Sequence, residues 1–337
     1  MLHRLKLFVL AIAAAAIGFC GWLIWFALSP IALPAPSLDF SIREGSTLRG
    51  ATRQMVEAGV PLSEWKFILL ARVNGASGSV KAGSYQAAEG TTPLLLIRKI
   101  VRGEYALAEI VFPEGWTFRQ MRELMSAHQD LKHDTANLEA AEVMEKLGEP
   151  GVFAEGLFFP DTYIFAKGSS ELAVLARARG AMKSQLAAAW AKRDADLPVA
   201  DEYETLILAS IVEKETGHAG DRAMVAGVFI NRLRRKMKLQ TDPTVIYGMG
   251  ERFNGNLRKR DLERDTPFNT YTRLGLPPHP IAMPGLASIA AVLHPAKTDA
   301  LYFVSRGDGT SEFSRTLIDH NRAVAKYQLP PRRRAKR

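Results

Sequence analysis

The sequence is almost free of cysteine, because its 337 residues include one, Cys20, inside an apolar run. A single thiol cannot form an internal disulfide, and it excludes a site in which several cysteines hold zinc or an iron–sulfur cluster. The 7 histidines include no pair spaced four apart, which excludes a metal-binding helix of the zincin type. No GxSxG, P-loop or dinucleotide-binding motif is present. The sequence therefore predicts no metal site and no cofactor.

Charge is missing from residues 7–28 (LFVLAIAAAAIGFCGWLIWFAL), a run of 22 residues. As a helix this run would span about 33 Å, enough to cross a hydrocarbon core of roughly 30 Å. Arg4 and Lys6 precede it, and no Lys or Arg follows until Arg43. The positive-inside rule then places residues 1–6 in the cytoplasm and exports the rest of the chain. The alternative, a signal peptide cleaved near Ala27-Leu28-Ser29, is less favoured because the run exceeds the usual 7–15 apolar residues.

The composition is that of a globular chain with a basic excess. It is 47% hydrophobic and 23% charged, with a net charge of +9, and its length predicts two or three domains. A basic balance suits nucleic acid, anionic lipid or an acidic polymer. Nucleic acid is disfavoured because the chain is predicted to be exported and lacks interleaved basic and aromatic residues.

A short strand, a Glu-Gly turn and a helix recur three times in the first part of the chain, with turns at Glu44-Gly45, Glu89-Gly90 and Glu114-Gly115. A Ser or Thr able to cap a helix follows each turn. We predict helices over 48–58, 93–102 and 118–126, and hence a small α+β module. Further along, helices are predicted over 172–192, 202–216 and 222–238, and a hairpin joins 300–305 to 311–314.

The predicted organisation is an α+β chain in seven segments. A cytoplasmic N-terminus precedes a transmembrane helix, a proline-rich spacer lifts a small α+β module off the bilayer, and a connecting helical segment leads to a helix-rich α+β domain and a basic tail. Their residues are 1–6, 7–28, 29–37, 38–126, 127–150, 151–328 and 329–337, respectively.

Acidic chemistry remains the best candidate for a site. In the helix predicted over 202–216, Glu215 continues an apolar stripe formed by Leu208, Ile211 and Val212 at i, i+3, i+4 and i+7 spacing. A carboxyl beside such a stripe loses water and its pKa should rise, as a general acid needs. Alternatively, the end of this helix turns to solvent and Glu213 and Glu215 are two routine charges. The basic end of the next predicted helix, at 231–236, is interpreted as a solvated face.

Two downstream loops suit a sugar cleft, because they place amide, hydroxyl, carboxylate and aromatic groups on a stiff, proline-rich backbone. The first, 239–244, carries Gln240 and Asp242, and the second, 267–285, carries Asn269 and Tyr271. An ordinary proline-rich connector with satisfied turn residues is the alternative.

Several motifs occur in one order along the chain: GLFFPDTY at 156–163, SIVEKET at 210–216, FINRL at 229–233, LQTDPTVIYG at 239–248, FNTY at 268–271, GLPP at 275–278 and HPA at 294–296. With them the sequence resembles the MltG (YceG-like) endolytic murein transglycosylases, from the membrane helix to about Tyr327. The family often has Gly after Leu-Pro-Pro, where this chain has His279, so we expect the local shape of that loop to differ.

The resemblance implies a LysM-like, peptidoglycan-binding module in the N-terminal half, a place in the bacterial inner membrane with the catalytic domain in the periplasm, and peptidoglycan glycan strands as substrate. Peptidoglycan synthases are further candidate partners. It also implies one catalytic residue, the second Glu of the Glu-Lys-Glu motif, here Glu215. Gln240, Asp242, Asn269 and Tyr271 are then expected to position the sugar.

The implied reaction is lytic transglycosylation. Glu215 would protonate the bond between N-acetylmuramic acid and N-acetylglucosamine, and the muramyl C6 hydroxyl would attack C1 to leave a 1,6-anhydro end. Two alternatives stay open. One is a muramidase that uses water and a second carboxylate, Asp242 or Asp161. The other is a membrane-anchored glycan-binding protein without catalysis.

Overall fold

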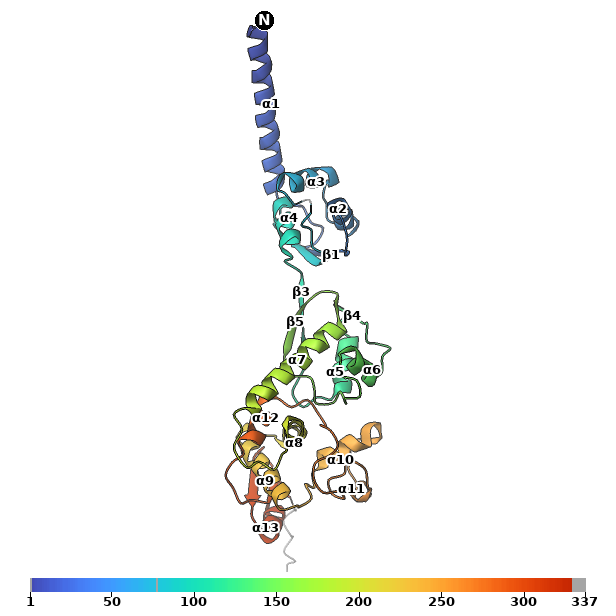
Figure 1. Cartoon of the computed structure of the whole chain (residues 1–337), viewed down its shortest axis with the longest axis vertical. Helices are drawn as coiled ribbons and strands as arrows, with labels where there is room; N and C mark the ends of the chain where they lie inside the picture. The colour runs from blue at the N-terminus through green and yellow to red at the C-terminus, as the bar shows by residue number, and fades with distance from the viewer. Residues whose placement is uncertain (1, 77, 329–337) are drawn as a thin grey trace, which may run out of the picture. The chain divides into compact units, whose positions relative to one another are not determined.

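The computed structural model describes residues 2–76 and 78–328, so the predicted basic tail, 329–337, lies outside the described residues. Helices alternate with short two-stranded sheets, which confirms the predicted α+β class. The chain divides into two compact units (Figure 1). The first runs up to Glu109 and includes Asp130–Lys132 and Ile164–Ser169. The second contains Ile110–Gln129, His133–Tyr163 and the residues from Ser170 onward.

The first unit begins with a long apolar helix, followed by a small sheet with three helices. Phe40 lies opposite Tyr85 in the antiparallel pair of β1 and β2, and the two rings stack. The elements are α1 (Leu2–Leu28), β1 (Ser37–Ile42), α2 (Leu48–Glu57), α3 (Glu64–Val73), β2 (Gly83–Ala88) and α4 (Pro93–Arg102). Two of the predicted helices are thus confirmed, whereas α3 was not predicted.

The recurring Glu-Gly turns have one physical cause. Gly45, Gly90 and Gly115 have φ values of 74°, 81° and 74°, in the left-handed region that glycine adopts at little cost. A threonine then caps the helix that follows in each repeat, through Thr47, Thr92 and Thr117. The boundary that we place at residue 126 for the module stays a prediction. The first compact unit runs up to Glu109, so the third turn and the helix that follows it belong to the second unit.

The proline-rich segment after α1 lies against the first unit. Ile31 is buried, and its N–H donates to the Thr91 carbonyl at 2.8 Å. The Glu89 N–H donates to the Pro36 carbonyl at 2.9 Å, and Leu33 packs against the same core. The segment is therefore packed against the core of the first unit along part of its length, and its role as a spacer between the membrane and the next domain stays a prediction.

The second unit is rich in helices. Its helices are α5 (Phe118–Ser126), α6 (Ala140–Lys146), α7 (Glu171–Trp190), α8 (Glu202–Glu215), η1 (Ala219–Asp221), α9 (Arg222–Arg234), α10 (Asp242–Met249), η2 (Gly250–Arg252), α11 (Lys259–Glu263), α12 (Leu286–Leu293) and α13 (Leu317–Tyr327). The predicted hairpin is confirmed as the antiparallel pair β7 (Tyr302–Ser305) and β8 (Ser311–Ser314). Two further strand pairs, whose residues do not all belong to the second unit, are β3 (Leu107–Val111) with β5 (Thr162–Ala166) and β4 (Leu131–Lys132) with β6 (Ser169–Ser170).

Helix α8 lies at the centre of the second unit, where it contacts α7, α9, α10 and α12. Every residue from Thr205 to Val212 is buried. A helix that is apolar on all sides belongs in a core, so the predicted apolar stripe describes one part of a fully enclosed helix. The carboxyl end of α8 is where polar residues begin, and it presents the two glutamates of the Glu-Lys-Glu motif.

Helix α9 is shorter than predicted. It ends at Arg234 rather than continuing to Lys238, because Lys236 adopts a φ of 52° that no helix interior allows. Arg232 near its end is buried, with 7% of its surface exposed, so the expected solvated basic face is wrong for this residue.

Candidate active site

Glu215 is the last residue of α8, and a loop further along the chain holds its carboxyl. The Thr241 hydroxyl donates a hydrogen bond to Glu215 Oε1. Thr241 is itself fixed, because its backbone N–H donates to Thr270 Oγ1 at 3.1 Å and its carbonyl accepts from Thr244 Oγ1 at 2.8 Å. Three buried threonines, Thr241, Thr244 and Thr270, therefore set the position of the carboxyl.

Burial raises the pKa of Glu215, because the charged carboxylate loses water. The hydrogen bond from Thr241 and the charge of Arg232 lower the pKa, while the charge of Asp242 raises it. Burial is the largest of these effects, and the net direction is upward. An upward shift of the pKa favours the protonated form of the carboxyl, which is the form that a general acid requires.

Glu215 faces a cavity of about 500 Å³ in the second unit. Its wall contains two carboxyl groups, one guanidinium, two tyrosine rings and residues from both strands of the hairpin. The residues that line it are Glu215, Arg232, Leu239, Gln240, Asp242, Tyr271, Tyr302, Phe303, Val304, Ser305, Ser311, Leu317, His320, Val324 and Gln328. The mixture of ring faces and hydrogen-bonding groups suits a sugar, which offers both stacking faces and hydroxyls.

Three of the four predicted sugar-positioning residues lie in this cavity with Glu215. The Tyr271 hydroxyl donates to Asp242 Oδ1 at 2.6 Å, which joins the two predicted loops at the cavity wall. Gln240 has a φ of 50°, and its N–H donates to the Thr270 carbonyl at 3.1 Å, so the strained backbone is held in place. The structure thus brings Gln240, Asp242 and Tyr271 together around one carboxyl.

Asn269 lies behind the cavity rather than in its wall. Its side-chain amide donates to the Leu262 and Arg264 carbonyls at 2.9 and 2.7 Å, where α11 ends. Its Oδ1 accepts from the Tyr271 N–H at 2.8 Å. The buried amide is therefore committed to backbone groups and acts on the cavity through Tyr271. Asp161, the other candidate for a second carboxylate, is exposed and accepts from the Thr162 N–H at 2.7 Å, away from this cavity.

Arg232, Tyr302 and His320 also line the cavity and were not predicted from the sequence. Arg232 Nε donates to the Leu301 carbonyl at 2.7 Å, and Nη1 donates to the Leu239 carbonyl at 2.7 Å. The guanidinium carbon lies 5.2 Å from the centre of the Tyr302 ring, and His320 stacks on that ring. Burial lowers the pKa of His320, with the Arg232 charge acting in the same direction. The FINRL motif was the available signal for Arg232.

The first glutamate of the Glu-Lys-Glu motif has a different environment. Glu213 Oε2 accepts from the N–H of Gly285, the residue that precedes α12, at 2.9 Å, and Arg222 lies 3.9 Å away. A Cβ at Gly285 would overlap the Glu114 carboxyl, so a larger residue there would require the Glu114 side chain to move. Burial raises the pKa of Glu114, and the Glu213 charge adds to this. Glu213 therefore links α8 to the start of α12 and to Arg222 of α9. Of the two glutamates in the motif, Glu215 is the one that lines a cavity.

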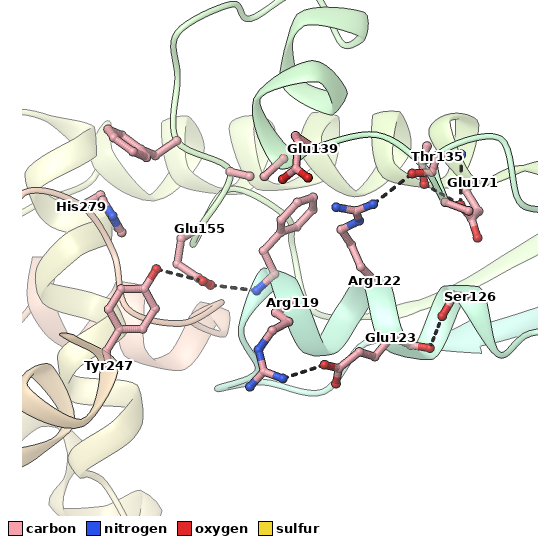
Figure 2. Close-up of a pocket in the computed structure, with 15 residues that line it drawn as sticks. Arg119, Arg122, Glu123, Ser126, Thr135, Glu139, Glu155, Glu171, Tyr247 and His279 are labelled. Atoms are coloured by element: carbon pink, nitrogen blue, oxygen red, sulfur yellow. Dashed lines mark hydrogen bonds and ion pairs between the residues drawn. The ribbon is translucent and has the colours of Figure 1, made fainter. Parts of the chain in front are cut away.

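A second cavity, of about 490 Å³, lies elsewhere in the second unit and also contains a buried carboxyl (Figure 2). Glu155 is 9% exposed, and its two oxygens accept from the Phe118 N–H at 2.9 Å and the Tyr247 hydroxyl at 3.2 Å. Burial raises its pKa from about 4.5 to about 7 against these hydrogen bonds. Figure 2 shows Glu155 between its two donors.

The other polar groups of this second cavity bind one another. Arg119 pairs with Glu123 at 2.6 Å, and Arg122 donates to the Thr135 carbonyl at 2.9 Å (Figure 2). The Thr135 hydroxyl donates to the buried carboxylate of Glu171 at 2.5 Å. These polar side chains of the second cavity are therefore engaged with other groups of the protein.

His279, the departure from the family pattern, belongs to an aromatic cluster at this second cavity. Its ring lies 4.7 Å from those of Phe153 and Phe268, centre to centre, and 5.6 Å from that of Tyr247. Its Nδ1 donates to the Pro280 carbonyl at 2.7 Å, and burial lowers its pKa. The proline-rich loop is also tied to α8, because the Ile281 N–H donates to Ser210 Oγ at 3.0 Å. The loop accommodates His279 by packing it.

Within residues 2–76 and 78–328, no three His, Cys, Asp or Glu side chains are grouped so that they could hold a metal ion. The cavity around Glu215 offers a proton donor and hydrogen-bonding groups. Its arrangement is suited to acid–base chemistry on a neutral, hydroxyl-rich ligand.

Comparison with known proteins places this chain in a family. The YceG-like family matches residues 40–326. A protein of Bacillus subtilis (strain 168) named endolytic murein transglycosylase is 33% identical over 311 residues, which cover 86% of this chain and 85% of that protein. One of the same name from Streptococcus pneumoniae (strain D39) is 28% identical, and the match covers 85% of this chain and 57% of that protein.

A solved structure agrees with these matches. The crystal structure of a YceG-like protein of Listeria monocytogenes aligns with a TM-score of 0.55 and 31% sequence identity. The alignment covers 85% of this chain and 98% of the Listeria chain. The family match and the extent of both alignments lead to one conclusion: this chain belongs to the YceG-like family.

Proposed function

We propose that the protein cleaves the β-1,4 bond between N-acetylmuramic acid and N-acetylglucosamine within peptidoglycan strands and leaves a 1,6-anhydromuramyl end. The family and the names of its relatives indicate a lytic transglycosylase, which is a lyase, without specifying the bond or the product. The observation that carries the finer proposal is a single carboxyl of raised pKa, Glu215, in the wall of a cavity of about 500 Å³.

In the first step, protonated Glu215 gives its proton to the glycosidic oxygen. The bond from that oxygen to the muramyl C1 breaks, and positive charge develops on the sugar ring. Thr241 donates to Oε1, and no hydrogen bond to Oε2 is found among the described residues, so Oε2 is the oxygen available to carry the proton. Asp242, which Tyr271 orients, places a carboxylate in the same wall and can stabilise the positive charge.

In the second step, the Glu215 carboxylate takes the proton of the muramyl C6 hydroxyl as its oxygen bonds to C1. The proton given up in the first step is thereby recovered, and no water is consumed. One carboxylate suffices because the nucleophile belongs to the same sugar and lies close to C1. Cleavage inside a strand would end the elongation of a newly made glycan.

The proposed location is the bacterial inner membrane, with the second unit in the periplasm. Helix α1 is long and apolar enough to cross a membrane over His3–Leu28. The basic residues before the apolar run favour a cytoplasmic N-terminus. Anchoring would restrict the enzyme to glycan strands near the membrane, where peptidoglycan synthases work.

The muramidase alternative has one observation in its favour, the presence of Asp242 in the same cavity as Glu215. A hydrolase of the inverting type needs a second carboxylate free to activate water. One oxygen of Asp242 already accepts from Tyr271 at 2.6 Å, which favours a fixed electrostatic role. A protein that binds glycan without cleaving it would not need a carboxyl in the wall of the binding cavity with one oxygen free of hydrogen bonds to the described residues.

The test is mass spectrometry of purified peptidoglycan after digestion by the full chain in detergent, beside Glu215→Gln and Glu155→Gln. The full chain is needed because Leu23 and Ala27 of α1 are part of the core of the first unit. Anhydromuramyl ends from the wild type and Glu155→Gln, but not from Glu215→Gln, would support the proposal. Reducing ends that contain an added water would establish a muramidase. Bound but uncleaved glycan with all three proteins would refute catalysis.

A further inference from the structure

Helix α1 is partly buried at its C-terminal end and exposed along the rest of its apolar run. Leu23 and Ala27 are buried in the core of the first unit together with Ile31, and Trp22 and Phe26 pack against that core. Residues 7–21, by contrast, are exposed along their whole length. The helix therefore passes directly from its free apolar part into the folded unit, with no linker between them.

The free part of the helix is too short to span a bilayer alone. Its 15 residues, 7–21, cover about 22 Å, whereas the hydrocarbon core is roughly 30 Å thick. Mismatch of this size is relieved when the membrane thins or when neighbouring structure enters the interface. From Trp22 to the end of α1, the first unit covers one side of the helix. If α1 crosses the membrane, some of these covered residues lie at the level of the lipid headgroups, and the first unit must reach that level with them.

Helices α3 and α4 of the first unit both lie at the end of α1 that adjoins this unit (Figure 1). Trp65 of α3 stacks on Trp22 of α1, with ring centres 5.6 Å apart, and remains 60% exposed. Lys66 Nζ lies 5.5 Å from the centre of the Trp22 ring and 5.8 Å from that of Phe26. Exposed tryptophan beside a lysine that covers apolar rings is typical of a membrane interface.

A positively charged cavity opens beside Trp65. It has a volume of about 440 Å³ and is lined by Arg49, Arg53, Glu64, Trp65, Ile68, Leu69 and Arg72. The three arginines are exposed, and none of them forms an ion pair with another described residue. Three guanidinium groups against one carboxylate leave a net positive charge, and guanidinium binds phosphate with a matching pair of donors.

We propose that this surface, which we define as Arg49, Arg53, Trp65, Lys66 and Arg72, binds the headgroups of anionic phospholipids on the outer face of the membrane that α1 crosses. The inference rests on the proposed crossing by α1. Lipid headgroups are the occupant because the surface continues directly from the membrane helix and carries the opposite charge. Such binding would hold the first unit against the membrane rather than leaving it free to swing.

The test uses the full chain in lipid nanodiscs with one fluorescent label and headgroup spin-labelled lipid as quencher. Val73, exposed at the end of α3, is replaced by Cys in a Cys20→Ser background and labelled. A matched label replaces Glu104, which follows α4 where the chain leaves towards β3 (Figure 1). We expect the label at 73 to be quenched about twofold or more over that at 104, and the difference to grow with the phosphatidylglycerol content and shrink with salt.

A charge variant and an anchor control separate the possible failures. Arg49→Ala/Arg53→Ala/Arg72→Ala should remove the dependence on phosphatidylglycerol, whereas Arg43→Ala, an exposed arginine outside the cavity, should not. A label on the native Cys20, quenched by acyl-chain spin label, reports the crossing by α1. Equal quenching at 73 and 104 with Cys20 in the bilayer would overturn this inference and leave the anchor intact. An unquenched Cys20 would refute the anchor itself.

Discussion

The two cavities of the second unit each contain a glutamate whose pKa burial raises, and they differ in what the carboxyl touches. Glu155 accepts from the Phe118 N–H and the Tyr247 hydroxyl, one donor on each oxygen. Glu215 accepts from Thr241 through one oxygen and faces a cavity that Gln240, Asp242 and Tyr271 also line. A raised pKa therefore indicates burial, whereas the hydrogen-bond partners decide whether a carboxyl is available for chemistry.

The largest expected effect comes from changing each glutamate to Gln. Glu215→Gln keeps an oxygen that can accept from Thr241 but has no proton to give, so cleavage should fall by about 10³-fold or more. Glu155→Gln should retain cleavage within about threefold, because no reacting group is removed. The rate of release of soluble muropeptides from purified peptidoglycan measures both. Similar losses in the two variants would contradict the distinction between the cavities.

The second prediction concerns stability against pH. Below about pH 4.5 Glu155 is protonated in both the folded and the unfolded chain, and between 4.5 and 7 only the unfolded chain releases the proton. Stability should therefore fall as pH rises through this window, by up to about 3 kcal/mol in total, with Glu215 adding in the same direction.

Unfolding by urea in detergent, followed by circular dichroism from pH 5 to 8, measures this slope. Glu155→Gln should flatten it, because Gln does not titrate. Glu145→Gln, at an exposed carboxyl of α6, serves as the control and should leave the slope unchanged. A slope that Glu155→Gln does not alter would show that this carboxyl titrates as it does in water.

The third prediction tests the role of the second cavity. His279→Ala removes a ring packed against those of Phe153, Phe268 and Tyr247 and should cost about 2 kcal/mol of stability. Cleavage at a temperature where the variant stays folded should change little, because His279 does not line the cavity around Glu215. A loss of activity without loss of stability would assign the substrate to both cavities.

The smallest effect is expected at Thr241. Thr241→Val keeps the shape and removes the hydroxyl that donates to Glu215 and lowers its pKa. The pKa of Glu215 should rise, so the fall of activity at alkaline pH should move to higher pH. The rate at the optimum should drop about tenfold, because the carboxyl is less well held. A pH profile that does not move, measured with the same muropeptide release, would show that this hydrogen bond does not act on the reacting group.

Much of this arrangement could be predicted from the sequence. The helix that ends at Glu215, the Glu-Gly turns with their capping threonines and the hairpin all follow from local chemistry, which neighbours in the chain determine. Gln240, Asp242 and Tyr271 were selected because loops rich in amides and aromatics suit a sugar cleft, and all three line the cavity that Glu215 faces; their role in positioning the sugar stays a prediction.

The remainder depends on contacts between distant segments. Arg232 looked like part of a solvated basic face, but its partners are carbonyls at Leu239 and Leu301 that only the folded chain brings near. Asn269 has the same donors and acceptors whether it faces a sugar or the end of α11, so its residue type could not decide. The burial of Ile31 depends likewise on the path of the whole first unit.

A crystal structure of the full-length Glu215→Gln variant with a peptidoglycan oligosaccharide bound would decide between the two cavities. The proposed mechanism predicts a sugar in the cavity that residue 215 lines, with its ring beside Tyr271 or Tyr302. The scissile oxygen should lie within hydrogen-bond reach of the side-chain amide introduced by the substitution. A glycan bound at Glu155 instead, with the cavity around residue 215 empty, would contradict the mechanism.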